Sequence, residues 1–382
     1  MNKKVLILVD WYLPGYKGGG QIKAVEYIVS NLKERFDFYI LCRDHDFDGV
    51  VYPDLEKNKW LKFDNVHIKY LSNKNKPYIV SVVDEIRLNI WDVIYMNSFF
   101  SFFFSILPCA YLNFLGGVER NIILAPRGEF STGALGIKKA KKYFFIIFSR
   151  IINLHKEITW HVSTELEKDD VQKCFPRAKV HIARELLPVA IQSNEIGIEK
   201  HVGTLKLLFL SRVTNKKGLD YALKVLGTIK SGCVELDIYG PIEDKKYWSE
   251  CEILIETLPE NIVVKYCGEL PHNKIKDVIP RYHLLFFPTL GENFGYVIIE
   301  TLLSCRPVLI SDRTPWRDLA ENKVGYDISL DELNLFAEKI KEFIGMDQIE
   351  FDKYIVNVNT YADKYVENQR SIVEDNIRLF SE

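Results

Sequence analysis

The sequence has few cysteines, and they form no recognisable pattern. The seven cysteines among the 382 residues are scattered along the chain without a C-x-x-C pair. We therefore expect neither a disulfide framework nor a structural zinc site, and the thiols are typical of a protein in a reducing compartment. The eight histidines form no cluster at ligand spacing either, so no metal ion and no cofactor is expected.

An excess of charge of one sign is also lacking. The 50 Lys and Arg residues and 52 Asp and Glu residues give a formal net charge of -2. No strong overall field therefore attracts the protein to nucleic acid, and we expect no nucleic-acid partner. The apolar fraction of 47% and the charged fraction of 27% are ordinary for a globular protein.

Long hydrophobic runs are missing as well. The most apolar stretch, residues 99–115, is interrupted by Pro108 and falls short of the roughly 20 residues that span a membrane, so we expect a buried helix there. The N-terminus begins as a strand and shows no small-residue cleavage site. We therefore expect no signal peptide and a cytoplasmic location.

What the sequence does contain is a repeated alternation of strands and helices. Continuous apolar runs such as residues 4–10 and 205–211 are typical of buried parallel strands. A polar connection at 187–203 separates two such alternations, and 382 residues exceed the about 250–300 that one core supports. The pattern predicts an α/β fold of two Rossmann-like domains facing across a cleft, with boundaries at 1–188 and 189–365. A C-terminal helix, 366–382, is expected to pack back toward the N-terminal domain.

Two basic residues follow the first strand of the second domain. Arg212 and Lys217 lie in the segment SRVTNKKGLD, between a predicted strand and a predicted helix. A guanidinium group and an ammonium group beside free helix N–H groups suit a diphosphate. Alone, this segment is more typical of an ordinary basic loop.

Two carboxylates accompany a later helix start. In PTLGENFGYVIIE, residues 288–300, Gly291 and Gly295 bracket Glu292, and Glu300 follows eight positions later. Eight residues are just over two helical turns, so both carboxylates can face the same side. Glu300 stands among apolar neighbours and is expected to have a polar partner.

These segments resemble the donor site of the group 1 glycosyltransferases (family 4, GT-B fold). The resemblance rests on E-N-F-G-Y-V-I-I-E, the following R-P-V-L-I-S-D, the upstream S-R-x4-K-G and C-G-E-L-P-H at 267–272, across about residues 205–320. It implies a retaining, metal-independent hexosyltransferase that uses a UDP or GDP sugar. The N-terminal domain would bind a glycan or lipid-linked acceptor, and the pathway would build a surface polysaccharide.

The resemblance also implies roles for individual residues. Arg212 and Lys217 would bind the diphosphate, Glu292 would hold the sugar with the amides that follow it, and Glu300 would bind the ribose. Arg212, Lys217 and Glu292 would form the catalytic set. The implied donor-binding residues are Gly19, Gly20, Arg212, Lys217, Gly268, Glu292, Asn293, Phe294, Gly295 and Glu300.

A glycine-rich loop, LPGYKGGGQIK, follows the first strand of the chain. A dinucleotide fingerprint that begins at Gly18 would need glycine where Lys23 stands, and a P-loop that begins at Gly15 fails after Gly20. By the resemblance, Gly19 and Gly20 would contact donor phosphates and Gly18 the acceptor. A flexible surface turn remains the alternative.

A second loop of the N-terminal half supplies acceptor candidates. Arg127 and Glu129 lie in LAPRGEF, residues 124–130, where many family members carry a histidine. Arg127 could instead bind an acidic acceptor or a phosphate. A capping box from Thr164 to Glu167 is interpreted as scaffold.

Two further features remain open from the sequence. The D-x-D motifs at 44–48 lie in a polar loop and are rejected as metal ligands. The basic, apolar segment 138–156 predicts either a helix on an anionic membrane surface or a core-packed helix with a solvated basic start. On the same architecture, the alternatives to a transferase are a sugar-nucleotide epimerase, a pyridoxal-phosphate phosphorylase and a non-catalytic binding protein.

Overall fold

The computed structural model divides the chain into two compact units. One contains Met1–Val189 together with Gln369–Glu382, and the other contains Ala190–Asn368; they are called the N-terminal and C-terminal domains here. The structure describes residues 2–74, 76–88, 90–115, 121–136, 139–188 and 197–381. The expected boundary between 188 and 189 adjoins 189–196, which lie outside the described residues. The cleft expected between the domains stays a prediction.

The N-terminal domain is built on an eight-stranded sheet with the order β3-β4-β2-β1-β5-β6-β7-β8. Only β3 runs antiparallel to its neighbour. The strands are β1 (Lys3–Leu8), β2 (Phe36–Arg43), β3 (Trp60–Phe63), β4 (Val66–Leu71), β5 (Val93–Asn97), β6 (Asn121–Ala125), β7 (Ile158–Val162) and β8 (Lys179–Ile182). The helices are α1 (Gly20–Leu32), α2 (Tyr78–Arg87), the π-helix η1 (Phe102–Ile106), α3 (Leu107–Phe114), α4 (Thr132–Gly136), α5 (Lys139–Ile151), α6 (Glu165–Cys174) and α13 (Gln369–Ser381).

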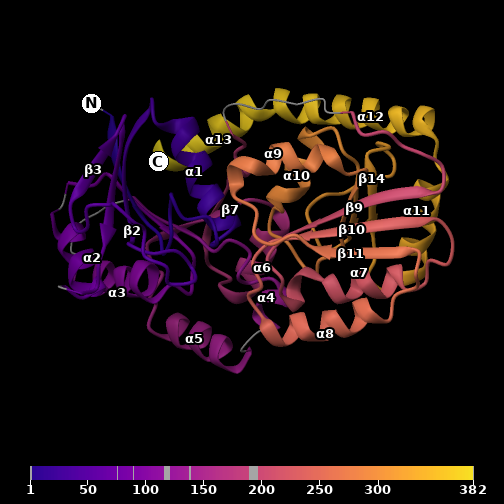
Figure 1. Cartoon of the computed structure of the whole chain (residues 1–382). Coiled ribbons are helices and arrows are strands. Elements are labelled where there is room, and N and C mark those ends of the chain that lie inside the picture. The colour runs from indigo at the N-terminus through magenta and orange to yellow at the C-terminus, as the bar shows by residue number, and fades with distance from the viewer. Residues whose placement is uncertain are drawn as a thin grey trace. The chain divides into compact units, whose positions relative to one another are not determined.

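The C-terminal domain contains a six-stranded, fully parallel sheet with the order β11-β10-β9-β12-β13-β14. Its strands are β9 (Thr204–Leu210), β10 (Cys233–Tyr239), β11 (Ile262–Tyr266), β12 (Leu284–Phe287), β13 (Val308–Ser311) and β14 (Gly325–Ile328). Its helices are η2 (Asn215–Lys217), α7 (Leu219–Leu226), α8 (Lys245–Glu256), η3 (His272–Lys274), α9 (Ile275–Val278), η4 (Ile279–Arg281), α10 (Tyr296–Leu303), α11 (Leu333–Gly345) and α12 (Gln348–Glu367). Figure 1 shows helices around this sheet and the long α12 running along the domain.

The last helix of the chain, α13, packs within the N-terminal domain. Its Phe380 is fully buried, and the ring lies 5.6 Å from Phe36, 6.0 Å from Phe38 and 5.4 Å from Tyr95 between centroids. Figure 1 shows α13 beside α1. The chain therefore leaves the N-terminal domain after β8 and returns to it at its end.

Most of the apolar segment 99–115 is helical, as predicted, but the helix is buried only in part, whereas a buried helix was expected. Ser101 caps the π-helix by accepting a hydrogen bond from the Phe104 amide at 3.3 Å. Phe104 is fully buried, whereas Phe102 is 55% and Phe114 57% exposed. No helix in the described part of the chain is long and apolar enough to cross a membrane.

Each sheet has a point at which the strand order reverses. It lies between β1 and β5 in the N-terminal domain and between β9 and β12 in the C-terminal domain. Sheets of this kind bind ligands beyond the carboxyl ends of the strands at such points. The loops after these four strands are therefore the places where a site is expected.

Candidate functional site

Lys217 belongs to the loop after β9. It ends the 3-10 turn η2, and Gly218 follows with φ of +75°. A Cβ atom at Gly218 would lie 2.1 Å from the Pro288 carbonyl oxygen. Only glycine therefore allows the loop after β9 to approach the loop after β12 so closely.

Glu292, in the loop after β12, is the partner of Lys217. Lys217 Nζ donates a hydrogen bond to Glu292 Oε1 at 2.5 Å, and the side chains are 14% and 13% exposed. Burial raises the pKa of Glu292, but the charges of Lys217 and Lys216 and hydrogen bonds from Lys217 and Thr289 outweigh it, and the pKa lies below its usual value. Glu292 is therefore ionised at neutral pH and holds an ammonium group at this point of the domain.

The helix that follows Glu292 directs its N-terminus to the same place. Gly295, with φ of +81°, precedes α10. The Phe294 side chain is buried against Trp316, whose indole N–H donates to the Phe294 carbonyl at 2.6 Å. Because its ring is committed to the core, Phe294 can meet a ligand only through its backbone. The partial positive charge at the N-terminus of α10 favours negative charge in front of the helix.

Glu300 lies in α10 and has the polar partner that its apolar surroundings require. His272 Nε2 and Glu300 Oε1 are 3.1 Å apart, and the Glu300 side chain is 13% exposed. His272 follows β11 in the same loop as Gly268, which has φ of +82° and open space beside its Cα atom. The pair joins the loop after β11 to the helix after β12.

Arg212 occupies a more open position after β9. Its Nη1 donates to Glu243 Oε2 at 2.6 Å, and the two side chains are 34% and 32% exposed. The pair joins the loop after β9 to the loop after β10. A partly exposed guanidinium group can exchange a carboxylate for a phosphate, because both offer two oxygens to its planar donors.

The glycine-rich loop of the N-terminal domain is held by one carboxylate. Asp46 Oδ2 accepts hydrogen bonds from the amides of Tyr16 at 2.9 Å and Lys17 at 3.2 Å, and Lys17 Nζ pairs with Asp48 at 2.8 Å. Gly19 has φ of +67° at the start of α1. The interpretation of the loop as a flexible turn is therefore disfavoured, and Asp46 and Asp48 of the D-x-D motifs contact the loop.

Asp44, in the same motifs, is likewise paired. Its carboxylate lies 3.1 Å from His45 Nδ1 and 3.4 Å from Lys57 Nζ. Among the described residues, no three or more His, Cys, Asp and Glu side chains form a group that could hold a metal ion.

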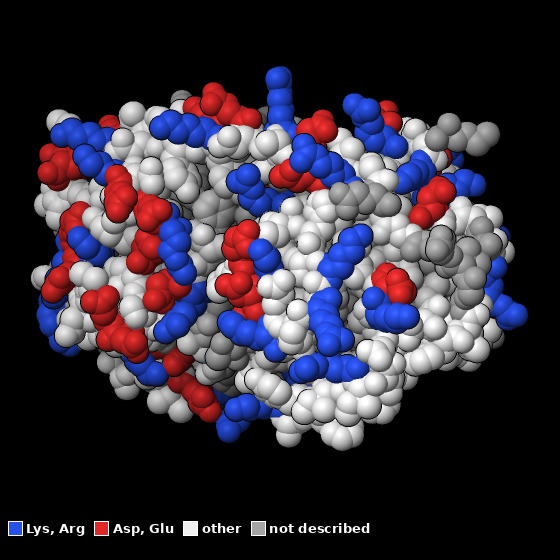
Figure 2. Space-filling view, turned by 180° about the vertical axis from the view of Figure 1, so that it is seen from behind, with Lys and Arg blue, Asp and Glu red and all other residues white. Residues whose placement is uncertain are grey.

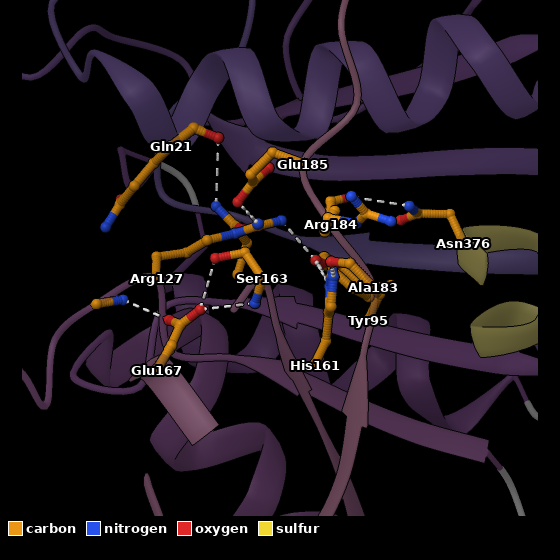
Figure 3. A network of polar contacts seen from close by, with 12 residues as sticks. Gln21, Tyr95, Arg127, His161, Ser163, Glu167, Ala183, Arg184, Glu185 and Asn376 are labelled. Atoms are coloured by element: carbon orange, nitrogen blue, oxygen red, sulfur yellow. Dashed lines mark hydrogen bonds and ion pairs between the residues drawn. The ribbon is translucent and has the colours of Figure 1, made fainter. Parts of the chain in front are cut away.

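Arg127 lies in a buried polar network at the carboxyl ends of β5, β6 and β7. Nε donates to Asn97 Oδ1 at 2.7 Å, Nη1 to Glu185 Oε1 at 2.5 Å and Nη2 to Tyr95 Oη at 2.6 Å. Its side chain is 6% exposed, and Figure 3 shows it directed at Glu185 and Tyr95. Asn97 in turn donates to the Gln21 carbonyl at 3.4 Å, at the start of α1.

Two further carboxylates fix the loop that contains Arg127. Glu129 accepts from Ser98 Oγ at 2.7 Å and from the amides of Phe99 and Phe100, and burial raises its pKa. Glu167 accepts from the Gly128 amide at 2.6 Å. This geometry favours a positioning role for Arg127 and Glu129 over direct contact with an acceptor, since their polar groups are used inside the domain.

The family of the C-terminal domain follows from a comparison of sequences. Residues 192–360 match the family model described as glycosyl transferases group 1. The C-terminal domain is a group 1 glycosyltransferase domain. The sequence matches no curated protein.

Solved structures of low sequence identity share the fold of the whole chain. Sucrose-phosphate synthase from Thermosynechococcus elongatus is 12% identical over 100% of this chain and 98% of its own, with a TM-score of 0.72. The pneumococcal O-GlcNAc transferase GtfA, in complex with UDP and GlcNAc, is 12% identical over 100% and 99%, with a TM-score of 0.64. WaaG, a glycosyltransferase involved in lipopolysaccharide biosynthesis, is 14% identical over 94% and 95%, with a TM-score of 0.64. These likenesses show a GT-B fold of two Rossmann-like domains.

Within the group 1 glycosyltransferase domain, the structure pairs residues that the sequence named separately. Lys217 and Glu292 are in contact. His272 was not assigned a role, although it stands in the C-G-E-L-P-H segment. Lys216 was missed as well, and its charge contributes to the low pKa of Glu292. Gly18, Gly19 and Gly20 belong to the other domain, so their roles toward donor and acceptor stay predictions.

Proposed function

We propose that the protein transfers a sugar from a UDP or GDP sugar with retention of anomeric configuration and without a metal ion. The observation that carries the proposal is the buried Lys217–Glu292 pair at the N-terminus of α10. It places an ammonium group and a carboxylate beside the positive end of a helix dipole. Those groups match a nucleoside diphosphate joined to a polyhydroxylated sugar.

The chemical difficulty of this reaction is the charge that develops on the leaving diphosphate. Lys217 and Arg212 would neutralise it, together with the first turn of α10, because donors fixed before the reaction need no reorganisation during it. Arg212 would leave Glu243 to bind a phosphate oxygen. The proposal therefore assigns to side chains the charge neutralisation that a divalent metal gives in other transferases.

The remaining contacts would select the donor. Glu300, held by His272 at 3.1 Å, would accept hydrogen bonds from ribose hydroxyls. Glu292 would accept from a sugar hydroxyl, and the backbone around Asn293 and Gly295 would donate to the distal phosphate. Gly268, in the same loop as His272, has open space where a side chain would begin and is the proposed neighbour of the base.

The acceptor is proposed to be a glycan or a lipid-linked glycan of a surface polysaccharide. Support comes from structures that share the fold, since one was solved with UDP and GlcNAc and another acts in lipopolysaccharide biosynthesis. The N-terminal domain, with its clamped glycine-rich loop, would receive the acceptor.

Helix α5 supports a location at an anionic membrane surface, proposed here as the inner face of the cell membrane. Of the proposed segment 138–156, residues 139–156 are described. Phe144 and Ile151 are each 73% exposed, and only Ile146 and Ser149 of α5 are buried. The alternative of a core-packed helix is therefore disfavoured, because most of the apolar side chains face outward.

Donor turnover in EDTA tests the proposal. Purified protein would be incubated with a panel of UDP and GDP sugars, and slow hydrolysis would be followed by proton NMR, with water as the acceptor. We expect release of one nucleoside diphosphate and of a sugar that first appears in the anomeric form of the donor. Conversion of the donor to another nucleotide sugar would indicate the epimerase instead, and binding without turnover would indicate a non-catalytic protein.

A further inference from the structure

A cavity lies in the N-terminal domain, next to the C-terminal end of α5. Its volume is about 660 Å³, and its lining includes Arg150, Lys156 and Arg177 around Trp160 and Phe175. We call it the basic pocket. Its residues come from the last turn of α5, from the connection between α5 and β7, from β7 itself and from the connection between α6 and β8.

The basic pocket is separate from the Arg127 network. Residues 153–156 precede β7 and residues 175–178 precede β8, so they lie at the amino ends of these parallel strands. Arg127 and Glu185 follow β6 and β8 and lie at the carboxyl ends. The pocket thus lies at the amino ends of the strands, whereas the loops that would bind an acceptor lie at their carboxyl ends.

The pocket combines cations with an aromatic floor. The His155 ring lies 5.5 Å from Trp160 and 5.4 Å from Phe175, and its Nδ1 is buried without a hydrogen-bond partner among the described residues. Burial lowers the pKa of His155 to about 3, so the ring is neutral at physiological pH. A neutral imidazole can donate to or accept from a ligand atom, whereas Arg150 and Arg177 can each bind an anionic oxygen pair.

The charges around the pocket are not balanced by acids. Lys156 Nζ lies 3.6 Å from Glu157, in a pair that is 69% and 76% exposed and therefore weak. No ion pair of Arg150 or Arg177 with another described residue is found within 4.0 Å. An anion would consequently find at least two guanidinium groups available.

The pocket continues into the exposed apolar face of α5. That face consists of Tyr143, Phe144, Ile147, Phe148 and Ile151, which are 42–73% exposed. On the face displayed in Figure 2, Lys and Arg side chains and uncharged surface make up the lower part of the N-terminal domain, on the right. A second copy of the chain on this face would bring like charges together, which is unfavourable. An anionic lipid surface matches both the cations and the apolar side chains.

We propose that the basic pocket binds the phosphate headgroup of an anionic lipid while the apolar face of α5 enters the lipid surface. The proposal rests on the membrane contact included in the proposed function, but not on sugar transfer. Arg177 lies 27 positions after Arg150 and outside α5. The two arginines therefore come from different elements, and the proposed site is a pocket between these elements and not only a charged face of one helix. The neutral His155 and the aromatic floor would contact the glycerol part of the headgroup.

Vesicle binding tests the role of the two arginines. Flotation of the full chain would be measured at low salt with vesicles of phosphatidylcholine alone or mixed with phosphatidylglycerol. Arg150→Gln/Arg177→Gln should weaken partition into the anionic vesicles by more than about 30-fold, since two cations near such a surface contribute roughly that much by charge alone and the two guanidinium groups would add charge-assisted contacts with the headgroup phosphate. The matched control, Lys139→Gln/Lys141→Gln, removes equal charge from α5 outside the pocket. A loss in the control as large as in the arginine variant would overturn the proposal, as would an arginine variant that binds like the wild type.

A soluble probe separates a lipid site from a phosphate site. Calorimetric titration with dihexanoyl-phosphatidylglycerol, below its micelle concentration, should show saturable binding that His155→Phe weakens at least threefold without a change of net charge. Inorganic phosphate should bind much more weakly. Equal affinity for inorganic phosphate would make the pocket a free-phosphate site and refute the lipid assignment. Nucleotide binding should be unchanged in all pocket variants, so a failure of the donor proposal would be seen separately.

Discussion

Lys217→Ala removes the cation of the buried Lys217–Glu292 pair and leaves Glu292 without its 2.5 Å partner. Breaking a fully buried pair costs about 3–5 kcal/mol. Both side chains here retain slight exposure, 14% and 13%, and Lys216 still acts on Glu292. We therefore expect a lower loss of unfolding free energy, about 1–3 kcal/mol at pH 7.

The pH dependence of this loss identifies its cause. In the folded wild type the pKa of Glu292 lies below its usual value, so the pair stabilises the fold above the unfolded pKa of about 4.3 and stops doing so as the pH falls through the folded pKa. Protonated Glu292 needs no cation. In Lys217→Ala, burial without the lysine charge should raise the pKa of Glu292, so the variant protonates Glu292 at a higher pH than the wild type does. The difference in unfolding free energy between wild type and Lys217→Ala should consequently shrink as the pH falls from 7 toward 4.

Urea unfolding at several pH values, followed by circular dichroism, measures this difference. The control is Lys224→Ala, which removes a lysine from an exposed pair with Asp220 in the same domain and should cost less than about 0.5 kcal/mol. Adding Glu292→Gln to Lys217→Ala should restore part of the lost stability by removing the buried charge. A Lys217→Ala protein as stable as the wild type at pH 7, or a difference that does not depend on pH, would refute the reasoning.

Three further substitutions test other contacts of the structure. Glu300→Ala should weaken UDP or GDP binding about tenfold, from the loss of one or two hydrogen bonds of about 1 kcal/mol each, and should leave the binding of inorganic diphosphate unchanged. An equal loss of affinity for both ligands in calorimetry would contradict the ribose role of Glu300. Asp46→Asn weakens two amide contacts and should speed amide exchange at residues 16 and 17 about fivefold, measured by mass spectrometry; unchanged exchange would show that the carboxylate does not hold the loop. Arg127→Lys cannot keep three planar bonds and leaves Glu185 poorly paired, so we expect about 2–4 kcal/mol of destabilisation in urea, and an unchanged midpoint would contradict the network in Figure 3.

The fold and the donor motifs were predictable because their information is local. Apolar runs such as 205–211 identify buried strands, and Arg212 and Lys217 directly follow one of them. Glu292 and Glu300 likewise lie close in sequence, one just before the start of α10 and one within it. A strand, the loop after it and the next helix are contiguous in sequence, so the sequence alone indicates which residues lie in the loop between strand and helix.

The partners across loops were not predictable in this way. The contact of His272 with Glu300 joins loops that follow different strands, and sequence spacing gives no distance between them. Arg127 was expected at an acceptor, yet three internal hydrogen bonds use its guanidinium group. Those bonds go to β5 and to the segment after β8, which only the tertiary structure brings together with the loop after β6.

The sequence also did not predict which apolar side chains are exposed. The sequence of segment 138–156 was consistent with a core-packed helix that has a solvated basic start and with a helix on an anionic membrane surface, since either can combine lysines with large apolar residues. The outward direction of Phe144 and Ile151 distinguishes them. Which face of a helix is left uncovered depends on how its neighbours pack, and that is not contained in its own periodicity.

Nucleotide binding in the absence of metal tests the central claim most directly. Calorimetric titration of the full chain with UDP, GDP and ADP in EDTA should show saturable binding of one of them, weakened about 10–100-fold in Lys217→Ala through the loss of a charge-assisted contact of roughly 1.5–3 kcal/mol. Lys224→Ala should bind like the wild type. Absence of binding to every nucleotide at millimolar concentration, or equal binding by Lys217→Ala, would contradict the assignment of the Lys217–Glu292 pair to a donor diphosphate.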